Sequence, residues 1–101
     1  MEALVSYSDT EAIVRLRGRF DFGAHREFRE ATEEALARPN VTKVTMDLSR
    51  VDYLDSSALG MLLLLRDKAK AANRAVTLCG CSNAVRQVLD VANFGKLFTI
   101  V

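Results

Sequence analysis

Apolar and polar residues follow two different periods along this chain, one typical of strands and one typical of helices. Stretch 12–17 alternates, with Val14 and Leu16 on one side and Arg15 and Arg17 on the other. Such alternation predicts a strand that is buried on one face. Longer stretches repeat apolar residues every three or four positions, which predicts helices with one apolar stripe. The pattern therefore predicts a chain that mixes strands and helices.

The predicted elements follow one another closely, with turn residues between them. In chain order we predict strands at 3–8 and 12–17, a helix at 24–37, a strand at 41–48, a helix at 57–72, a strand at 75–79, a helix at 84–91 and a strand at 97–101. We expect Gly18 to end the second strand, and Gly95 to take a positive φ after the last helix. The order predicts an α/β fold with a mixed β-sheet of about five strands backed by about three helices, in a single domain of residues 1–101.

The helix predicted at 57–72 has two contrasting faces. At about 100° per residue, the side expected to face the core is entirely apolar and comprises Ala58, Leu62, Leu65, Ala69 and Ala72. The opposite side comprises Ser56, Gly60, Leu63, Leu64, Asp67 and Ala71. The two leucines on that side have two explanations. Single exposed leucines are normal in proteins, and an apolar surface can also bind a partner.

The residues just before this helix carry the candidate chemistry. Asp55 and Ser56 follow a strand and precede the helix. Asp and Ser cap helix N-termini because their oxygens accept from free backbone N–H groups, so either residue can be the N-cap. A helix N-terminus also favours an anion, so a serine here is well placed to carry a phosphate. The residues alone leave plain capping and phosphorylation as two open interpretations.

The composition excludes several functional classes. The chain has 101 residues, half of them hydrophobic, and 14 Lys and Arg against 13 Asp and Glu give a net charge of +1. This balance provides no electrostatic footprint for nucleic acid or for an anionic membrane. The apolar run 58–65 is too short to cross a bilayer, and the first residues lack the features of a signal peptide. We therefore expect a cytoplasmic protein.

No set of residues matches a metal or cofactor site. Cys79 and Cys81 are too few for a structural zinc site, so we expect half-buried reduced thiols. His25 is the only histidine and is expected at the surface. The chain also lacks a Gly-x-x-x-x-Gly-Lys loop, so we expect no metal, no cofactor and no tight nucleotide binding.

The string Asp-Ser-Ser-Ala-Leu-Gly at 55–60 resembles the phosphorylation motif of bacterial anti-sigma factor antagonists, which are stand-alone STAS domains. The family pattern after a strand is Asp-Ser-(Ser or Ala)-(Gly or Ala)-Leu-Gly, and every position fits. The resemblance implies a mixed sheet backed by helices, with Ser56 as the phosphorylated residue.

A second segment, 18–23, resembles the Gly-x-x-Asp loop that lies beside the serine loop in that family and takes part in partner contact. The resemblance implies such a role for Asp21, whereas a role as a turn or cap residue is the alternative. Phe20 and Phe22, on either side of it, are expected to be core residues or loop anchors.

The resemblance implies a regulatory binding protein and not an enzyme. The unphosphorylated form would bind an anti-sigma factor with a serine-kinase domain and so free a sigma factor or another target. Phosphorylation of Ser56 by that kinase would end the interaction, and a PP2C-type phosphatase would restore it. The residues expected to contact the partner are Asp21, Asp55, Ser56, Ser57, Gly60, Leu63 and Leu64.

Three other functions are weighed against this one. A receiver-like domain would use Asp55 as its phosphoacceptor, but the first strand does not end in an acidic pair for Mg²⁺ and no lysine ends a late strand. A STAS domain that docks without being phosphorylated remains open. A serine hydrolase is disfavoured because the chain has no Gly-x-Ser-x-Gly string.

Overall fold

Five strands form one mixed sheet in the computed structural model, which describes residues 1–101. The strands lie in the order β1-β2-β3-β4-β5, with β1 and β2 antiparallel and the other neighbours parallel. The elements are β1 Glu2–Ser8, β2 Glu11–Phe20, a 3-10 helix Phe22–Ala24, α1 His25–Ala37, β3 Lys43–Leu54, α2 Ser56–Ala71, β4 Ala75–Cys79, α3 Asn83–Val91, a second 3-10 helix Phe94–Lys96 and β5 Thr99–Ile100. The predicted fold class is confirmed.

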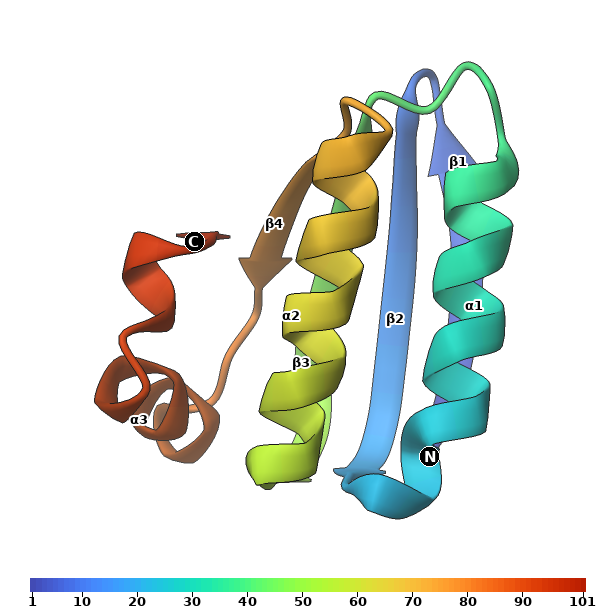
Figure 1. The fold of residues 1–101 in the computed structure, drawn as a ribbon. Coiled ribbons are helices and arrows are strands. Elements are labelled where there is room, and N and C mark those ends of the chain that lie inside the picture. Colours follow the sequence, from blue (N-terminus) through green and yellow to red (C-terminus); the bar gives the residue numbers. More distant parts are fainter.

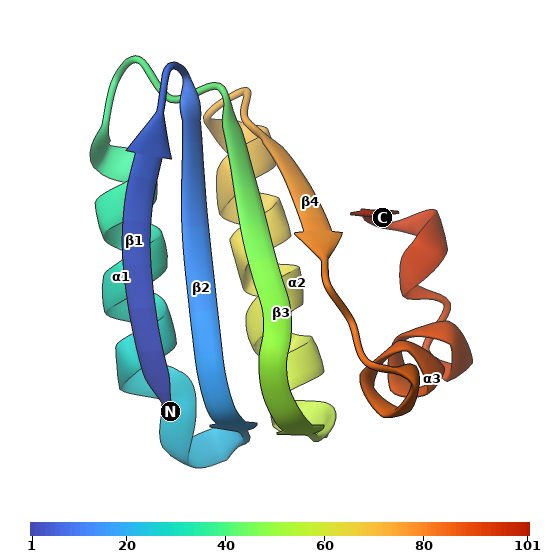
Figure 2. The same ribbon diagram turned by 180° about the vertical axis from the view of Figure 1, so that it is seen from behind.

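Helices α1 and α2 cover one face of the sheet, and α3 lies at one side near the end of β4 (Figure 1). Seen from behind, strands β1 to β4 lie in front of α1 and α2, and no helix covers them (Figure 2). The predicted alternation in β2 is confirmed, because Val14 and Leu16 are buried under the helices while Arg15 and Arg17 are exposed on the open face. No helix is both long enough and apolar enough to cross a membrane.

The core lies between the sheet and the two helices that cover it. Most of the buried strand residues come from β2 and β3, and β4 adds Leu78. Helix α1 contributes Phe28, Ala31 and Ala35. From α2 the buried residues are Ala58, Met61, Leu62, Leu65 and Ala69. The expectation for Ala72 is wrong, because α2 ends at Ala71 and Ala72 is its exposed C-cap.

Strands β2 and β3 are both longer than the sequence pattern predicts. Gly18 does not end β2, because its φ of +102° accompanies a register shift through which the strand continues to Phe20. The polar residues after Leu48 do not end β3 either, since parallel pairing with β2 extends to the pair Phe20 and Leu54. The two strands therefore deliver their following loops to the same end of the sheet.

The C-terminal segment also differs from the prediction. Asn93, and not Gly95, takes the positive φ after α3, at +60°. A 3-10 helix follows, and only Thr99–Ile100 of the predicted strand 97–101 pairs with β4. Stacking of the buried Phe94 and Phe98 rings, with centroids 5.3 Å apart, holds this segment against the core and shortens the strand.

Replacing Gly80 by alanine should destabilise the protein. Gly80 follows β4 with a φ of +73°, and an added Cβ would lie 2.9 Å from the Cβ of Ser49 and 3.1 Å from its backbone nitrogen. A strained backbone position costs about 1–3 kcal/mol, so we expect Gly80→Ala to lower the free energy of unfolding by that amount in urea denaturation. Gly95→Ala is the matched control, because its Cβ would meet no atom within 4 Å. Equal midpoints for the two variants would contradict this account.

Candidate functional site

Asp55 caps helix α2 and leaves the neighbouring serine free. Its backbone is extended, and its Oδ1 accepts a hydrogen bond from the backbone N–H of Ala58 at 3.0 Å. Ser56 is the first residue of the helix, is exposed, and its hydroxyl makes no hydrogen bond within the protein. Of the two capping candidates, Asp55 is therefore the N-cap. The Ser56 hydroxyl takes no part in capping the helix.

The loop after β2 lies against the start of α2. The backbone N–H of Asp55 donates to the carbonyl of Phe20 at 3.3 Å, which joins the ends of β2 and β3. Asp21 follows Phe20 directly, and its Oδ1 accepts from the backbone N–H of Gly23 at 3.0 Å. Asp21 is thus the N-cap of the first 3-10 helix. Asp21 therefore has the cap role that was its alternative interpretation, and it lies beside the serine loop.

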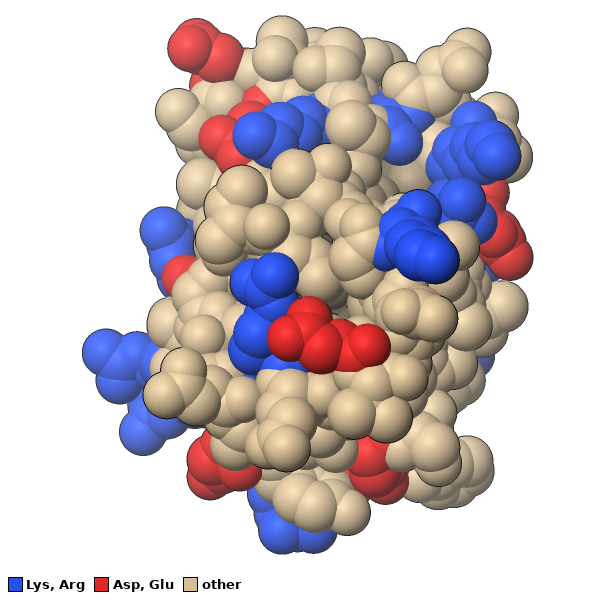
Figure 3. Space-filling model, turned by 90° about the vertical axis from the view of Figure 1, so that its left-hand side faces the viewer, with Lys and Arg blue, Asp and Glu red and all other residues tan.

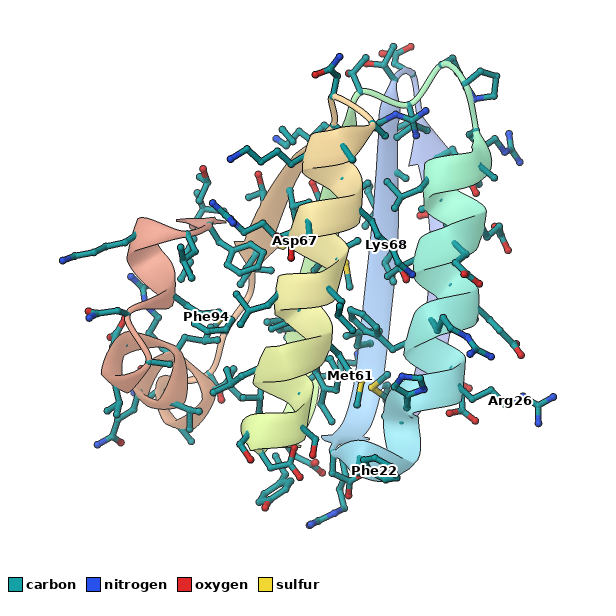
Figure 4. The ribbon with its side chains drawn as sticks, viewed as in Figure 1. Phe22, Arg26, Met61, Asp67, Lys68 and Phe94 are labelled. Atoms are coloured by element: carbon teal, nitrogen blue, oxygen red, sulfur yellow. The ribbon has the colours of Figure 1, made fainter.

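Aromatic side chains are exposed at this end of the molecule. Phe20 is buried as predicted, but Phe22 is 76% exposed, so the expectation that it is a core or anchor residue is wrong. Figure 4 shows Phe22 at the end of the molecule where α2 begins. The cause is local, because the 3-10 helix after Asp21 directs Ala24 into the core instead. Tyr53 is 41% exposed, with the Arg19 guanidinium 4.1 Å from its ring centroid.

A shallow, mostly apolar groove runs from Ser56 to helix α3. Its lining comprises Leu54, Asp55, Ser56, Leu59, Gln87, Val88, Val91 and Ala92. Val91 is 83% exposed. The α3 side of the molecule carries both signs of charge with uncharged surface between them (Figure 3). Sequence reasoning missed the part contributed by α3, although Val91 stands outside the apolar stripe of that helix and could have indicated it.

The two leucines of α2 lie in different environments. Leu64 is 56% exposed and lines a cleft between α1 and α2, together with His25 and Met61. Figure 4 shows Met61 and Lys68 on the side of α2 that faces α1. Leu63 is half-buried and packs against the hydrophobic core. Only Leu64 is therefore open to a partner over most of its surface.

The remaining predicted site residues lie close to Ser56 along the helix. Ser57 is half-buried, and Gly60, one turn after Ser56, is exposed. A Cβ built on Gly60 would meet no atom within 4 Å, so the surface beside the serine is open. The fold thus brings Asp21, Asp55 and Ser56 to one end of the sheet, while Leu64 lies further along α2 on the side of α1.

The cysteines and the histidine lie where the sequence predicts. Cys79 and Cys81 are free and half-buried, and burial raises the pKa of both thiols. Both thiols are therefore protonated at neutral pH. His25 is exposed. No group of three or more His, Cys, Asp and Glu side chains is placed to hold a metal ion.

Sequence comparison finds a family model and known proteins that are similar to this chain. The family model described as Mlab, STAS domain, matches residues 3–101. A STAS-domain containing protein of Pseudomonas aeruginosa (strain UCBPP-PA14) is 48% identical over 98 residues, covering 97% of this chain and 95% of the relative. The anti-sigma F factor antagonist of Paenibacillus polymyxa is 26% identical over 88 residues, covering 87% and 75%.

Solved structures with the same fold include the Bacillus anti-sigma factor antagonist SpoIIAA in two forms. The unphosphorylated form gives a TM-score of 0.74 at 22% identity, covering 98% of this chain and 86% of that chain. The phosphorylated form gives 0.73 at 21%, covering 98% and 90%. The similarity in fold therefore covers nearly the whole chain.

Removing the Asp55 cap should weaken the protein without changing its fold. Loss of an N-cap side chain costs about 1 kcal/mol, so we expect Asp55→Ala to lower the free energy of unfolding by about that amount. Asp55→Asn keeps an oxygen that can accept from Ala58 and should retain most of the stability. Thermal denaturation followed by circular dichroism measures both. If Asn is as destabilising as Ala, the hydrogen bond is not the source of the effect.

Proposed function

Because this chain belongs to the STAS domain family, with anti-sigma factor antagonists among its relatives, we propose that it is an anti-sigma factor antagonist that is switched by phosphorylation of Ser56. One observation carries the proposal. Ser56 is exposed on the first turn of α2, and its neighbour Asp55 supplies the cap. Its hydroxyl is therefore open to a kinase, and the helix does not depend on it.

The unphosphorylated protein binds an anti-sigma factor that carries a serine-kinase domain, and in this way frees a sigma factor or another target. The surface around Ser56 suits such contact, because Gly60 leaves room for close approach and the groove towards α3 offers apolar area. Burying one leucine-sized side chain contributes roughly 1.5–3 kcal/mol, which helps to offset the entropic cost of association.

Phosphorylation acts on this surface and leaves the fold intact. A phosphoserine adds a charge of about −1.5 to −2 at neutral pH. At the N-terminus of α2 the helix dipole favours that charge by about 0.3–1 kcal/mol, and repulsion from Asp55 offsets part of it. A partner that covers the phosphate must desolvate it, which costs several kcal/mol without a matching cation. A loss of about 4 kcal/mol weakens binding nearly a thousandfold.

The proposed cycle needs two partners besides the target. The kinase domain of the anti-sigma factor transfers the phosphate and supplies the ATP and its metal, and a PP2C-type phosphatase removes the phosphate again. The structurally similar SpoIIAA has been solved in both phosphorylated and unphosphorylated forms, which supports a cycle of this kind. We place the cycle in the cytoplasm, where ATP and sigma factors are found. The protein itself acts by binding and catalyses no reaction.

Substitutions at Ser56 test the switch directly. We expect Ser56→Asp to keep the fold and to lose most partner binding, although one carboxylate is a weaker mimic than a phosphate. Ser56→Ala should fold, bind the partner and resist the kinase. Because Asp55 is the cap, Ser56→Ala should cost little stability. The partner is first recovered by affinity capture from the source cell, and calorimetry with the purified partner then gives the dissociation constants.

Ser57 is the matched control for this experiment. It lies about 100° further round the helix and is half-buried, so the kinase should leave it unmodified. Mass spectrometry after incubation with the kinase and ATP locates the phosphate. Phosphate on Ser57 alone, or full binding by Ser56→Asp, would overturn the switch. A partner that binds but never phosphorylates the protein would identify a STAS domain used only for docking.

The leucines of α2 test the extent of the partner surface. We expect Leu64→Ser to weaken partner binding while changing the free energy of unfolding by less than about 0.5 kcal/mol, because Leu64 is mostly exposed. Leu63→Ser should destabilise the protein by about 1 kcal/mol or more, because Leu63 packs against the core. If Val91→Ser weakens binding and Leu64→Ser does not, the partner contacts the α3 side and Leu64 lies outside the interface.

A further inference from the structure

Strand β1 forms an edge of the sheet that nothing covers. It pairs only with β2, and Figure 2 shows no strand beyond it. Its outward-facing backbone N–H and C=O groups make no hydrogen bond with any other part of the protein. Such an edge is a template on which another extended chain can pair. This edge lies at the opposite side of the sheet from α3 and is separate from the groove at Ser56 (Figure 1).

A groove whose charged side chains are all acidic runs along this edge, between β1 and α1. Ala3, Val5 and Ala31 contribute apolar surface to it. Every charged side chain that lines the groove is acidic, and the members are Glu2, Glu27, Glu30 and Glu34. Three of these glutamates come from α1, at spacings of three and four residues that place them on one face of the helix. The groove therefore combines unpaired backbone groups with a row of carboxylates.

Some of these carboxylates already have partners, and the contacts are weak. Arg17 lies 3.9 Å from Glu2, with both side chains mostly exposed. Arg26 pairs with Glu30 at 3.1 Å, but both side chains are mostly exposed, so water screens the pair. Figure 4 shows Arg26 extending away from α1 into solvent. The hydroxyl of Tyr7 donates to Glu34 at 2.9 Å, which leaves the charge of Glu34 in place. Glu27 has no ion-pair partner within 4.0 Å.

We propose that the β1 edge binds a basic, extended peptide segment of a partner protein, which adds to the sheet as a sixth strand next to β1. In that strand alternate residues face the α1 side, where lysine or arginine would meet the glutamates. The residues between them face the open side of the sheet, where Leu4 is 59% exposed and offers apolar contact. The segment therefore alternates basic and apolar residues.

The dimensions of the groove fit this pattern. From Glu27 to Glu34 the helix rises roughly 10.5 Å, at about 1.5 Å per residue. Alternate residues of a strand are about 6.6 Å apart, so two or three successive basic side chains span the row of carboxylates. A second copy of this chain fits poorly, because pairing two β1 edges would place the two acidic rows beside each other. Acidic side chains at an edge oppose self-association in this way.

Titration with a synthetic peptide tests the proposal. The probe is an acetylated and amidated peptide of the sequence Val-Lys-Val-Lys-Val-Lys-Val, added to the full chain labelled with ¹⁵N. We expect chemical-shift changes in the amides of β1 and in the facing residues of α1, with binding that weakens as salt is added. Peptides N-methylated on alternate amides separate pairing from simple attraction, because methylation of one edge should abolish binding and methylation of the other should not.

Charge variants locate the electrostatic part of the interaction. Removing one exposed ion-pair partner weakens binding by up to about fivefold, so Glu27→Gln combined with Glu30→Gln should weaken it by up to about 25-fold. Glu33→Gln is the matched control, since Glu33 lies on the same helix but pairs with Lys68 of α2 at 4.0 Å. It should bind the peptide as the parent does, and Ser56→Asp should do the same.

Three results with the peptides would overturn the proposal. The first is equal binding of a peptide with the same composition but with its lysines grouped together. The second is equal binding of the two N-methylated peptides. The third is an absence of shift changes at β1 at millimolar peptide. Concentration-dependent dimerisation through β1, seen by the same amides without peptide, would show that the edge serves a second copy instead. None of these outcomes depends on the phosphorylation switch, so the two proposals fail independently.

Discussion

The parallel pairing of β2 with β3 is the constraint on which the functional end of the molecule depends. It continues through the irregular positions of both strands as far as Phe20 and Leu54. Because the two strands end side by side, the backbone of Asp55 can bond to the carbonyl of Phe20. This bond fixes where α2 begins, and it sets Asp21 beside the serine loop. A shorter pairing would leave both loops without a common support.

The division of tasks between Asp55 and Ser56 follows from this placement. A helix start needs a side-chain acceptor, and Asp55 supplies it from an extended backbone just outside the helix. The next residue is then free to carry a modification without loss of the cap. Adding charge at this point changes the surface that a partner meets, whereas the helix itself tolerates or favours an anion. A switch placed here can act on binding while the fold remains as it is.

The net charge of +1 conceals an uneven distribution. The charged side chains along the β1 groove are all glutamates, while the groove that contains Ser56 is mostly apolar. The molecule thus presents two different surfaces on opposite sides of one small sheet, and we propose a different kind of partner for each. An apolar surface gains from burial, whereas a free strand edge gains from backbone hydrogen bonds and from complementary charge.

The sequence by itself determined the order of the elements, the buried face of β2 and the position of the serine motif. These depend on local period and on residue type, which the chain carries at each position. It did not determine that Asp55 is the cap, that Phe22 is exposed, or that Leu63 is packed while Leu64 is open. The cap and the exposure of Phe22 depend on local backbone geometry, which residue type alone leaves open. The difference between Leu63 and Leu64 depends on the neighbours that each side chain meets from distant parts of the chain. The extension of β2 and β3 has the same cause, because backbone pairing between distant segments can override a local turn signal.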